Sequence, residues 1–190
     1  MNILLTSPPA LGKSVLLWEI ERLPNSLLVF GGRTRKVGLE EQIFNNIDPN
    51  QRAYLIIDEL DKMDKSDFSI LLGLGEEGRL KVDVHGKHID QTYDVRLFGA
   101  CNVLGGLPPE IQSRFMVFHI PEYNKDDYIK VVEGTLVKRE GMDEEFASFV
   151  ANQCYNNGFK DVRDAIRISR LSDNKEDAMN VMKTMIKYGG

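Results

Sequence analysis

Two features that would place this chain in a membrane or outside the cell are missing. No apolar run is long enough to span a bilayer, and the N-terminus has neither a basic region nor a cleavage pattern. Cysteine is scarce: Cys101 and Cys154 lie far apart and form no metal-ligand spacing or disulfide framework. We therefore expect a reducing compartment, a cytoplasmic location and no membrane partner.

A strong positive charge is also missing. The formal net charge is -5, so no overall basic field attracts the chain to nucleic acid or to anionic lipid. Any contact with nucleic acid must therefore depend on a local basic patch. What is present is an ordinary globular composition, with 42% hydrophobic and 28% charged residues, and 190 residues suffice for a main domain and a small second one.

The first two-thirds of the chain alternate between short apolar runs and helical patterns, which is typical of a layered α/β domain with a parallel sheet. The runs that predict strands are residues 2–6, 26–30, 53–59, 95–102 and 115–120. Helices are predicted over residues 12–22, where Val15, Leu16, Trp18 and Leu23 recur at roughly helical spacing, and over residues 39–47, 66–78 and 108–114. An alternating stretch at residues 79–93, centred on His85-Gly86-Lys87, predicts a β-hairpin.

The pattern changes after Pro121, where no further strand is indicated. Four amphipathic helices are predicted, over residues 125–139, 143–156, 160–171 and 174–187. We therefore expect an α/β domain over residues 1–121 and a small all-α domain over residues 122–190. In parallel sheets, ligands bind beyond the carboxyl ends of the strands, so the polar residues that follow the strands are the candidates for a site.

The stretch "LLTSPPALGKS" (residues 4–14) resembles a phosphate-binding loop. Such a loop needs small residues, a helix N-terminus, a lysine for the outer phosphates and a hydroxyl for magnesium. Lys13 and Ser14 supply the last two, while Ser7 replaces the usual first glycine and is tolerable if its φ is negative. The alternative is an ordinary strand–turn–helix. The residues that would hold the phosphates are Pro9, Ala10, Leu11, Gly12, Lys13 and Ser14.

The strand "YLIIDE" ends in two acids. Asp58 could hold magnesium together with Ser14, and Glu59 could orient or deprotonate an attacking water. The alternative is that both acids cap the next helix, with Asp61 and Asp64 as further surface acids. The phosphate loop upstream favours the functional interpretation.

Three more polar residues follow in order. Asn102 ends a predicted strand and could position the attacking water, although an Asn at a loop start is common. Arg114, at the end of a short helix, could stabilise charge on a transferring phosphoryl group, or be a surface arginine at that helix end. Arg163 could reach the nucleotide phosphates, with Arg167 one turn later as its rival; both could instead lie on a solvated face.

The order of these motifs resembles the AAA+ ATPase family over nearly the whole chain. "SPPALGKS" resembles Walker A, "YLIIDE" Walker B and Asn102 sensor 1, while Arg114 is similar to the arginine finger and Arg163 to sensor 2. The stretch from residue 70 to residue 102 looks like MoxR-like members, and "LPPEIQSRF" and the tail look like Lon and RuvB; the subfamily stays open. Ser7 and Ala10 depart from the pattern, as does the short segment before the first strand, because a longer one usually helps to hold the adenine.

The resemblance implies an ATPase that binds ATP and Mg between the α/β domain and a helical lid. It implies a homo-oligomer, usually a hexameric ring, that remodels or translocates a macromolecular substrate, protein or nucleic acid. In such a ring, Lys13 and the loop hold the phosphates, Glu59 activates water, Asn102 positions it, and Arg163 senses from the lid. Arg114 would act on the ATP of a neighbouring subunit.

The loop after the second strand, "GGRTRKVG", faces the pore in this family. Arg33, Arg35 and Lys36 could contact DNA there, with Lys81, His85, Lys87 and His88 of the hairpin adding to them; a merely solubilising loop is the alternative. Three functions stay open: an ATPase that remodels a macromolecule, a hydrolysis-deficient nucleotide-binding scaffold or regulator, and a small P-loop kinase. The helical tail and Glu59 argue against the kinase.

Overall fold

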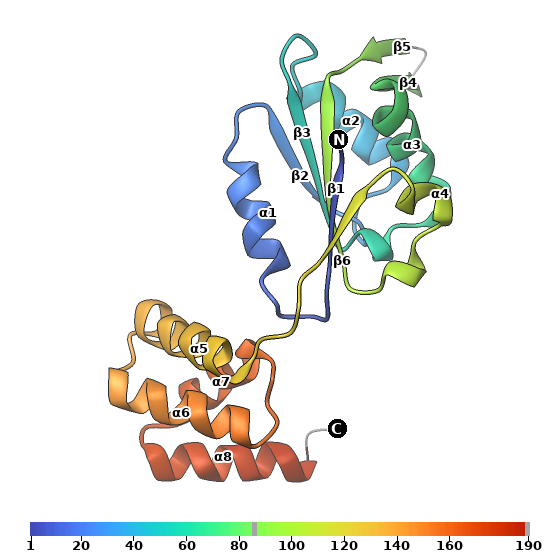
Figure 1. Ribbon diagram of the computed structural model, residues 1–190. Helices are drawn as coiled ribbons and strands as arrows, with labels where there is room; N and C mark the ends of the chain where they lie inside the picture. The colour runs from blue at the N-terminus through green and yellow to red at the C-terminus, as the bar shows by residue number, and fades with distance from the viewer. Residues whose placement is uncertain (85–86, 189–190) are drawn as a thin grey trace. The chain divides into compact units, whose positions relative to one another are not determined.

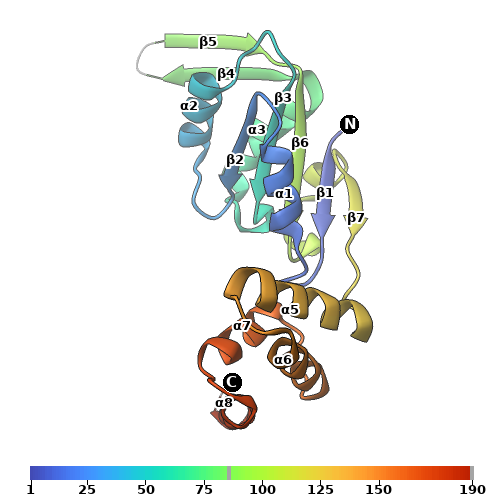
Figure 2. The same cartoon turned by 90° about the vertical axis from the view of Figure 1, so that its left-hand side faces the viewer.

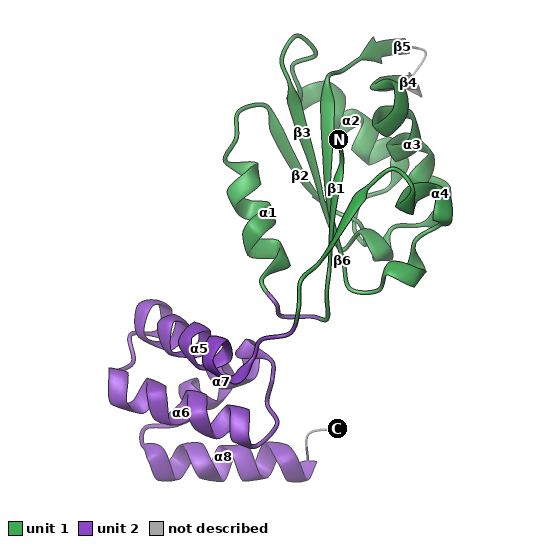
Figure 3. Cartoon of the chain, in the orientation of Figure 1, with its two compact units in different colours: residues 1–8, 12–121 green, residues 9–11, 122–190 purple. Residues whose placement is uncertain are grey.

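The computed structural model describes residues 1–84 and 87–188, with only the backbone for residues 82–84 and 87–89. It divides into two compact units (Figure 3). The first comprises residues 1–8 and 12–121, and the second comprises residues 122–190 together with residues 9–11. Each unit has its own apolar core, so each is described separately.

The first unit is built on a parallel sheet of five strands in the order β2-β3-β6-β1-β7. The strands are β1 (Ile3–Thr6), β2 (Ser26–Phe30), β3 (Ala53–Asp58), β6 (Val95–Cys101) and β7 (Met116–His119). β3, β6 and β1 are the three inner strands, and their carboxyl ends therefore lie side by side. The predicted parallel sheet is confirmed: β2 has the predicted bounds, and each of the other four strands is one or two residues shorter than expected.

Helices cover both faces of this sheet (Figure 1). α1 (Lys13–Glu21) lies on one face, where Leu17 packs against Ile56 and Ala100. The larger core lies on the other face, beneath α2 (Lys36–Asn46), α3 (Phe68–Glu77) and α4 (Pro109–Gln112). In the view turned by 90°, α1 lies in front of the sheet, and β1 and β7 lie to its right (Figure 2). Short 3-10 turns, η1 (Leu60–Lys62), η2 (Lys65–Asp67) and η3 (Leu104–Gly106), follow β3 and β6.

The apolar residues of α1 are more exposed than those of a helix that faces the core. Val15, Leu16 and Trp18 are about half exposed, at 53%, 49% and 47%, and Leu23 beyond the helix is also exposed. Only Leu17 among the apolar residues of α1 is buried. The helix is therefore where the spacing predicts it, but most of its large apolar side chains face outward.

The alternating stretch forms the predicted hairpin of β4 (Arg79–Val84) and β5 (Lys87–Thr92), which are antiparallel. α3 ends at Gly78, whose φ is +63° and at which a Cβ atom would lie 2.2 Å from the carbonyl oxygen of Tyr93. A side chain would not fit there, so this glycine sets the entry into the hairpin. His85 and Gly86, its predicted centre, lie outside the described residues.

The second unit is all helical, as the periodicity predicts. It contains α5 (Lys125–Glu140), α6 (Glu144–Asn156), α7 (Val162–Arg170) and α8 (Lys175–Tyr188). Asn124, Asp143 and Asp161 cap α5, α6 and α7, each accepting a hydrogen bond from a backbone N–H of the first turn. Tyr128, Val132 and Cys154 are among the residues of its core. In the part of the chain that the structure describes, no helix could cross a bilayer.

Candidate functional site

Three neighbouring strands deliver the candidate residues to one edge of the sheet. Asp58 is the last residue of β3, Asn102 follows β6, and the loop that ends at Lys13 follows β1. Because these strands are parallel and adjacent in the order β3-β6-β1, their carboxyl ends meet. The order of the strands in the sheet therefore brings the residues of the sequence motifs close together.

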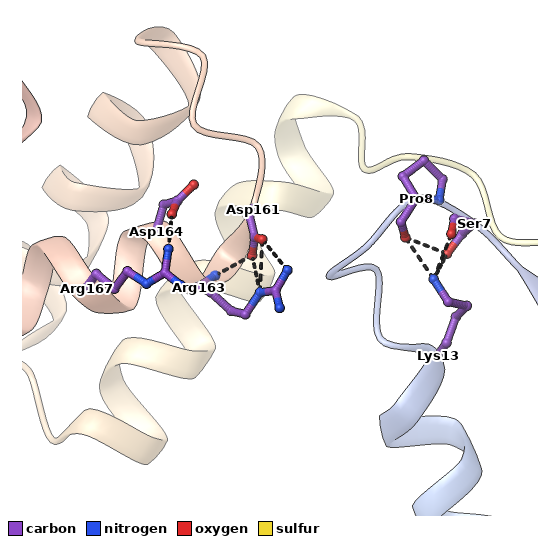
Figure 4. Close-up of polar contacts among 7 residues, drawn as sticks. All are labelled: Ser7, Pro8, Lys13, Asp161, Arg163, Asp164 and Arg167. Carbon is purple, nitrogen blue, oxygen red and sulfur yellow. Dashed lines mark hydrogen bonds and ion pairs between the residues drawn. The ribbon is translucent and has the colours of Figure 1, made fainter. Parts of the chain in front are cut away.

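Lys13 closes the loop on itself. Its side chain is buried, with 7% of its surface exposed, and its Nζ donates to the Ser7 carbonyl oxygen at 2.7 Å, the Ser7 Oγ at 2.8 Å and the Pro8 carbonyl oxygen at 2.9 Å (Figure 4). Burial lowers the pKa of Lys13, and nearby negative charges, including that of Asp58, act in the opposite direction. All three ammonium protons are thus directed to oxygens at the start of the loop.

The backbone strain of the loop lies at Ala10 rather than at Ser7. Gly12, the N-cap of α1, has a φ of +82°, which glycine adopts at little cost. Ala10 has a φ of +64°, a region that its Cβ disfavours, whereas Ser7 is not among the described residues with positive φ. The condition under which serine can replace the first glycine is therefore met.

Ser14 and Asp58 are joined by a hydrogen bond. The Ser14 Oγ donates to Asp58 Oδ2 at 2.6 Å, and the other carboxylate oxygen accepts from the Glu59 backbone N–H at 2.8 Å. A hydroxyl and a carboxylate in contact are the donors that Mg²⁺ uses beside phosphate oxygens and water. Where side chains are described, no group of three or more His, Cys, Asp or Glu could hold a metal. The pair therefore fits a magnesium ion that arrives with a nucleotide.

Glu59 has an unusual backbone conformation, with φ +54° and ψ +44°. Its Oε1 accepts a hydrogen bond from Lys62 Nζ at 2.6 Å, and both side chains are substantially exposed. The chain passes closely directly after β2: a Cβ atom at Gly31 would lie 2.5 Å from the Glu59 carbonyl oxygen. A positive φ at a non-glycine residue strains the backbone, and such strained residues are more frequent at functional sites.

Asp61 was not among the site residues predicted from the sequence, where it was considered only as a surface acid. Its side chain is half-buried, and its Oδ2 accepts from the backbone N–H groups of Asn102 and Val103, both at 3.1 Å. Its Oδ1 is buried without a hydrogen-bond partner among the described residues. The only sequence signal for this role is an acid three residues after Asp58, which by itself does not distinguish it from Asp64.

The structure does not bring Arg114 to this edge. Arg114 precedes β7, and its carbonyl oxygen accepts from the Asn2 side chain just before β1, so it lies where these strands begin. The candidate site lies where they end. The Arg114 guanidinium is ion-paired with Glu76 of α3 and is about one-third exposed. Within one copy of this unit, Arg114 is therefore separated from Ser14 and Asp58 by the length of a strand.

Arg163 and Arg167 lie on α7, and each is paired locally (Figure 4). Arg163 donates to both carboxylate oxygens of Asp161, the N-cap of that helix, and this contact lowers the pKa of Asp161 although its burial acts in the opposite direction. Arg167 pairs with Asp164 at 3.0 Å. Both arginine side chains are more than half exposed, so solvent can reach them.

The basic loop after β2 is partly neutralised by acids of the same unit. Arg35 is ion-paired with Asp64, and Lys36 lies 3.8 Å from the buried Glu40, while Arg33 is exposed beside the Phe30 ring. Lys81 of the hairpin is exposed. The side chains of His85, Lys87 and His88, which were expected to add positive charge, lie outside the described residues.

No family model and no curated protein sequence matches the chain. Solved structures do match. A variant of RuvB from Thermotoga maritima is similar over 97% of this chain, with a TM-score of 0.71 and 21% identity. A structure described as the RuvB Holliday junction branch migration motor of the same organism gives a TM-score of 0.69 and 19% identity over 97% of this chain. The chain spans 62% and 61% of the lengths of these proteins. The similarity confirms the expected α/β P-loop fold of the AAA+ type.

Proposed function

We propose that this chain is an AAA+ ATPase module that binds Mg-ATP and hydrolyses it to ADP and phosphate. The observation that carries the proposal is the Ser14–Asp58 hydrogen bond of 2.6 Å beside the buried Lys13. A lysine, a hydroxyl and a strand-end carboxylate at one edge of a parallel sheet are the groups that P-loop enzymes use for a nucleotide and its magnesium. Residues separated by 44 positions meet there, which an ordinary turn does not require.

Each residue has a separate role in the proposed reaction. Lys13 exchanges its three loop oxygens for phosphate oxygens, and the backbone N–H groups of residues 10–14 cradle the phosphates. Ser14 and Asp58 hold magnesium, which when bound neutralises charge on the phosphates. Glu59 takes a proton from the attacking water as the water oxygen bonds to the γ-phosphorus. The bond between that phosphorus and the bridging oxygen breaks, and ADP leaves. Asn102 orients that water, and Arg163 responds to the nucleotide from the helical unit.

We also propose that the active form is an oligomeric ring. Arg114 lies at the wrong edge of its own sheet, so it can act on a transferring phosphoryl group only in a neighbouring copy. The outward apolar side chains of α1, including Trp18, are typical of a surface that is covered in an assembly. Hydrolysis would then move the subunits and act on a macromolecular substrate.

For the substrate, we propose DNA rather than protein. Arg33 and Arg35 are exposed on the loop that follows β2, at the same edge as the candidate site. The RuvB structures of similar fold belong to a protein described as a branch migration motor of Holliday junctions. Because several charges of this loop are paired within the chain, we expect weak, salt-sensitive binding to phosphates without preference for base sequence.

The test is ATP hydrolysis per subunit as a function of protein concentration, with and without single-stranded DNA. We expect a rate that rises steeply with concentration and rises further with DNA. Lys13→Ala should abolish nucleotide binding, and Glu59→Gln should keep binding but lower turnover by about 100-fold or more. Glu41→Gln, an exposed acid on α2, is the control. Unchanged turnover in Glu59→Gln would exclude the assigned base.

Mixed subunits test the trans role of Arg114. Arg114→Ala subunits keep Glu59, and Glu59→Gln subunits keep Arg114. Each variant alone should be nearly inactive, whereas a mixture should regain part of the wild-type rate, because an intact arginine then faces an intact site. A mixture as inactive as its components would contradict action in trans.

A hydrolysis-deficient scaffold is the second candidate, and Lys13 favours it. Its ammonium is fully engaged by the Ser7 and Pro8 oxygens, which nucleotide must displace. This candidate predicts bound ADP or ATP with a near-zero rate at every concentration.

A further inference from the structure

Asp61 connects the two segments that carry the proposed water-handling groups. It lies in η1, two residues after Glu59, and its Oδ2 accepts from the N–H groups of Asn102 and Val103 at 3.1 Å each. The contact spans 41 residues of sequence between the ends of β3 and β6. These ends are held together by the sheet up to Ile57 and Gly99, and Asp61 extends the connection beyond the last paired residues.

Two consecutive backbone N–H groups directed to one carboxylate oxygen determine the path of the chain at Asn102. The backbone there cannot rotate without breaking both bonds, and so the direction in which the Asn102 side chain leaves the strand is set by Asp61. On the other side, η1 begins directly after the left-handed Glu59, so a shift of Asp61 moves the Glu59 turn as well.

The surroundings of the Asp61 carboxylate leave one of its oxygens without a hydrogen bond, so stability alone does not explain an acid at this position. Its Oδ1 is buried and unpartnered among the described residues. An exposed acid in the same segment, Asp64, pairs with Arg35 instead. An unpartnered buried acceptor requires an explanation, and a role in positioning the two strand ends supplies one.

We propose that Asp61 is a positioning residue that holds Asn102 and Glu59 in register for hydrolysis, without contacting the nucleotide itself. This inference rests on the proposed function. It predicts a defect in the chemical step rather than in binding, since Lys13, Ser14 and Asp58 keep their own contacts without Asp61.

The experiment compares Asp61→Ala, Asp61→Asn and the control Asp64→Asn in the full chain. We expect Asp61→Ala to lower kcat by about 10- to 100-fold while KM and the affinity for Mg-ADP change by less than about threefold. Asp61→Asn keeps an acceptor oxygen of the same size and should recover a substantial part of kcat. Asp64→Asn should behave as wild type.

Two results would overturn the inference. One is an unchanged kcat in Asp61→Ala. The other is a parallel loss of kcat, Mg-ADP affinity and thermal stability without recovery in Asp61→Asn, which would show a role in folding only.

Amide hydrogen exchange separates this inference from the proposed function. If the wild-type chain has no turnover, the proposed function fails. The positioning role is then decided by the Asn102 and Val103 amides, which should exchange faster in Asp61→Ala than in Asp61→Asn. Equal exchange rates in the two variants would overturn it.

Discussion

The chain up to Pro121 and the chain from Glu122 follow local structural rules to different degrees. Among the described residues, all three non-glycine residues with positive φ, Ala10, Asn25 and Glu59, precede Pro121. From Glu122 on, the described residues with positive φ are both glycines, Gly141 and Gly158. Of the nine buried polar or charged residues among the described side chains, seven also precede Pro121, and the other two are serines.

Helix ends show the same difference. α5, α6 and α7 begin with side-chain caps, whereas none of α1 to α4 has a side-chain cap hydrogen bond. α1 instead begins with bare N–H groups next to a glycine, which is the arrangement that binds an anion. Two of the three strained residues, Ala10 and Glu59, thus lie beside the proposed chemistry, whereas Asn25 lies where β2 begins.

The largest expected effect comes from the crowded backbone beside Glu59. Gly31→Ala places a Cβ atom 2.5 Å from the Glu59 carbonyl oxygen, so one of the two segments must move. We expect the free energy of unfolding to fall by about 1–3 kcal/mol. Urea unfolding measures the loss. At Gly32 the added atom would meet only the Lys62 side chain, so Gly32→Ala should be tolerated, and equal stability of the two variants would contradict the close approach.

A smaller effect is expected at a cap of the helical unit. Asp143→Ala removes the side chain that accepts from the Phe146 N–H at 2.9 Å. The free energy of unfolding should fall by about 1 kcal/mol, and the first-turn amides of α6 should exchange faster. Asp173→Ala, at an exposed carboxylate before α8, is the control. If both variants lose the same stability, the cap contributes nothing specific.

The smallest effect, and the only expected gain, concerns the strained loop. Ala10→Gly allows the φ of +64° without the Cβ penalty, while the unfolded chain gains freedom. The net result should be a stabilisation of roughly 0.5 kcal/mol, seen as a higher denaturation midpoint in urea. A lower midpoint would mean that the strain is not stored at this position.

Most elements of the fold were predictable because their signals are local. Short apolar runs indicated the strands of the sheet, alternation indicated the hairpin, and helical periodicity indicated the four terminal helices. The errors concern boundaries, since α2 begins at Lys36 rather than at residue 39. The spacing in α1 carried no prediction of a buried face, and most of its large apolar residues are exposed. Helical spacing shows that a helix forms, but only the neighbouring elements decide which face is covered.

The candidate site divides in the same way. The sequence motifs indicated Lys13, Ser14, Asp58 and Glu59, because these motifs follow strands that the sequence predicts. Asp61 could not be distinguished from Asp64, because its partners are backbone groups 41 and 42 residues away. The roles of Asn102, Arg114 and Arg163 stay predictions.

The sequence by itself determined which segments become strands and helices and which polar residues follow the strands, because these depend on neighbours in the chain. Only the tertiary structure decided that β3, β6 and β1 lie side by side, that Ser14 meets Asp58, and that Arg114 lies at the opposite edge. The strand order is set by packing of the whole sheet against its helices, and no local pattern records it.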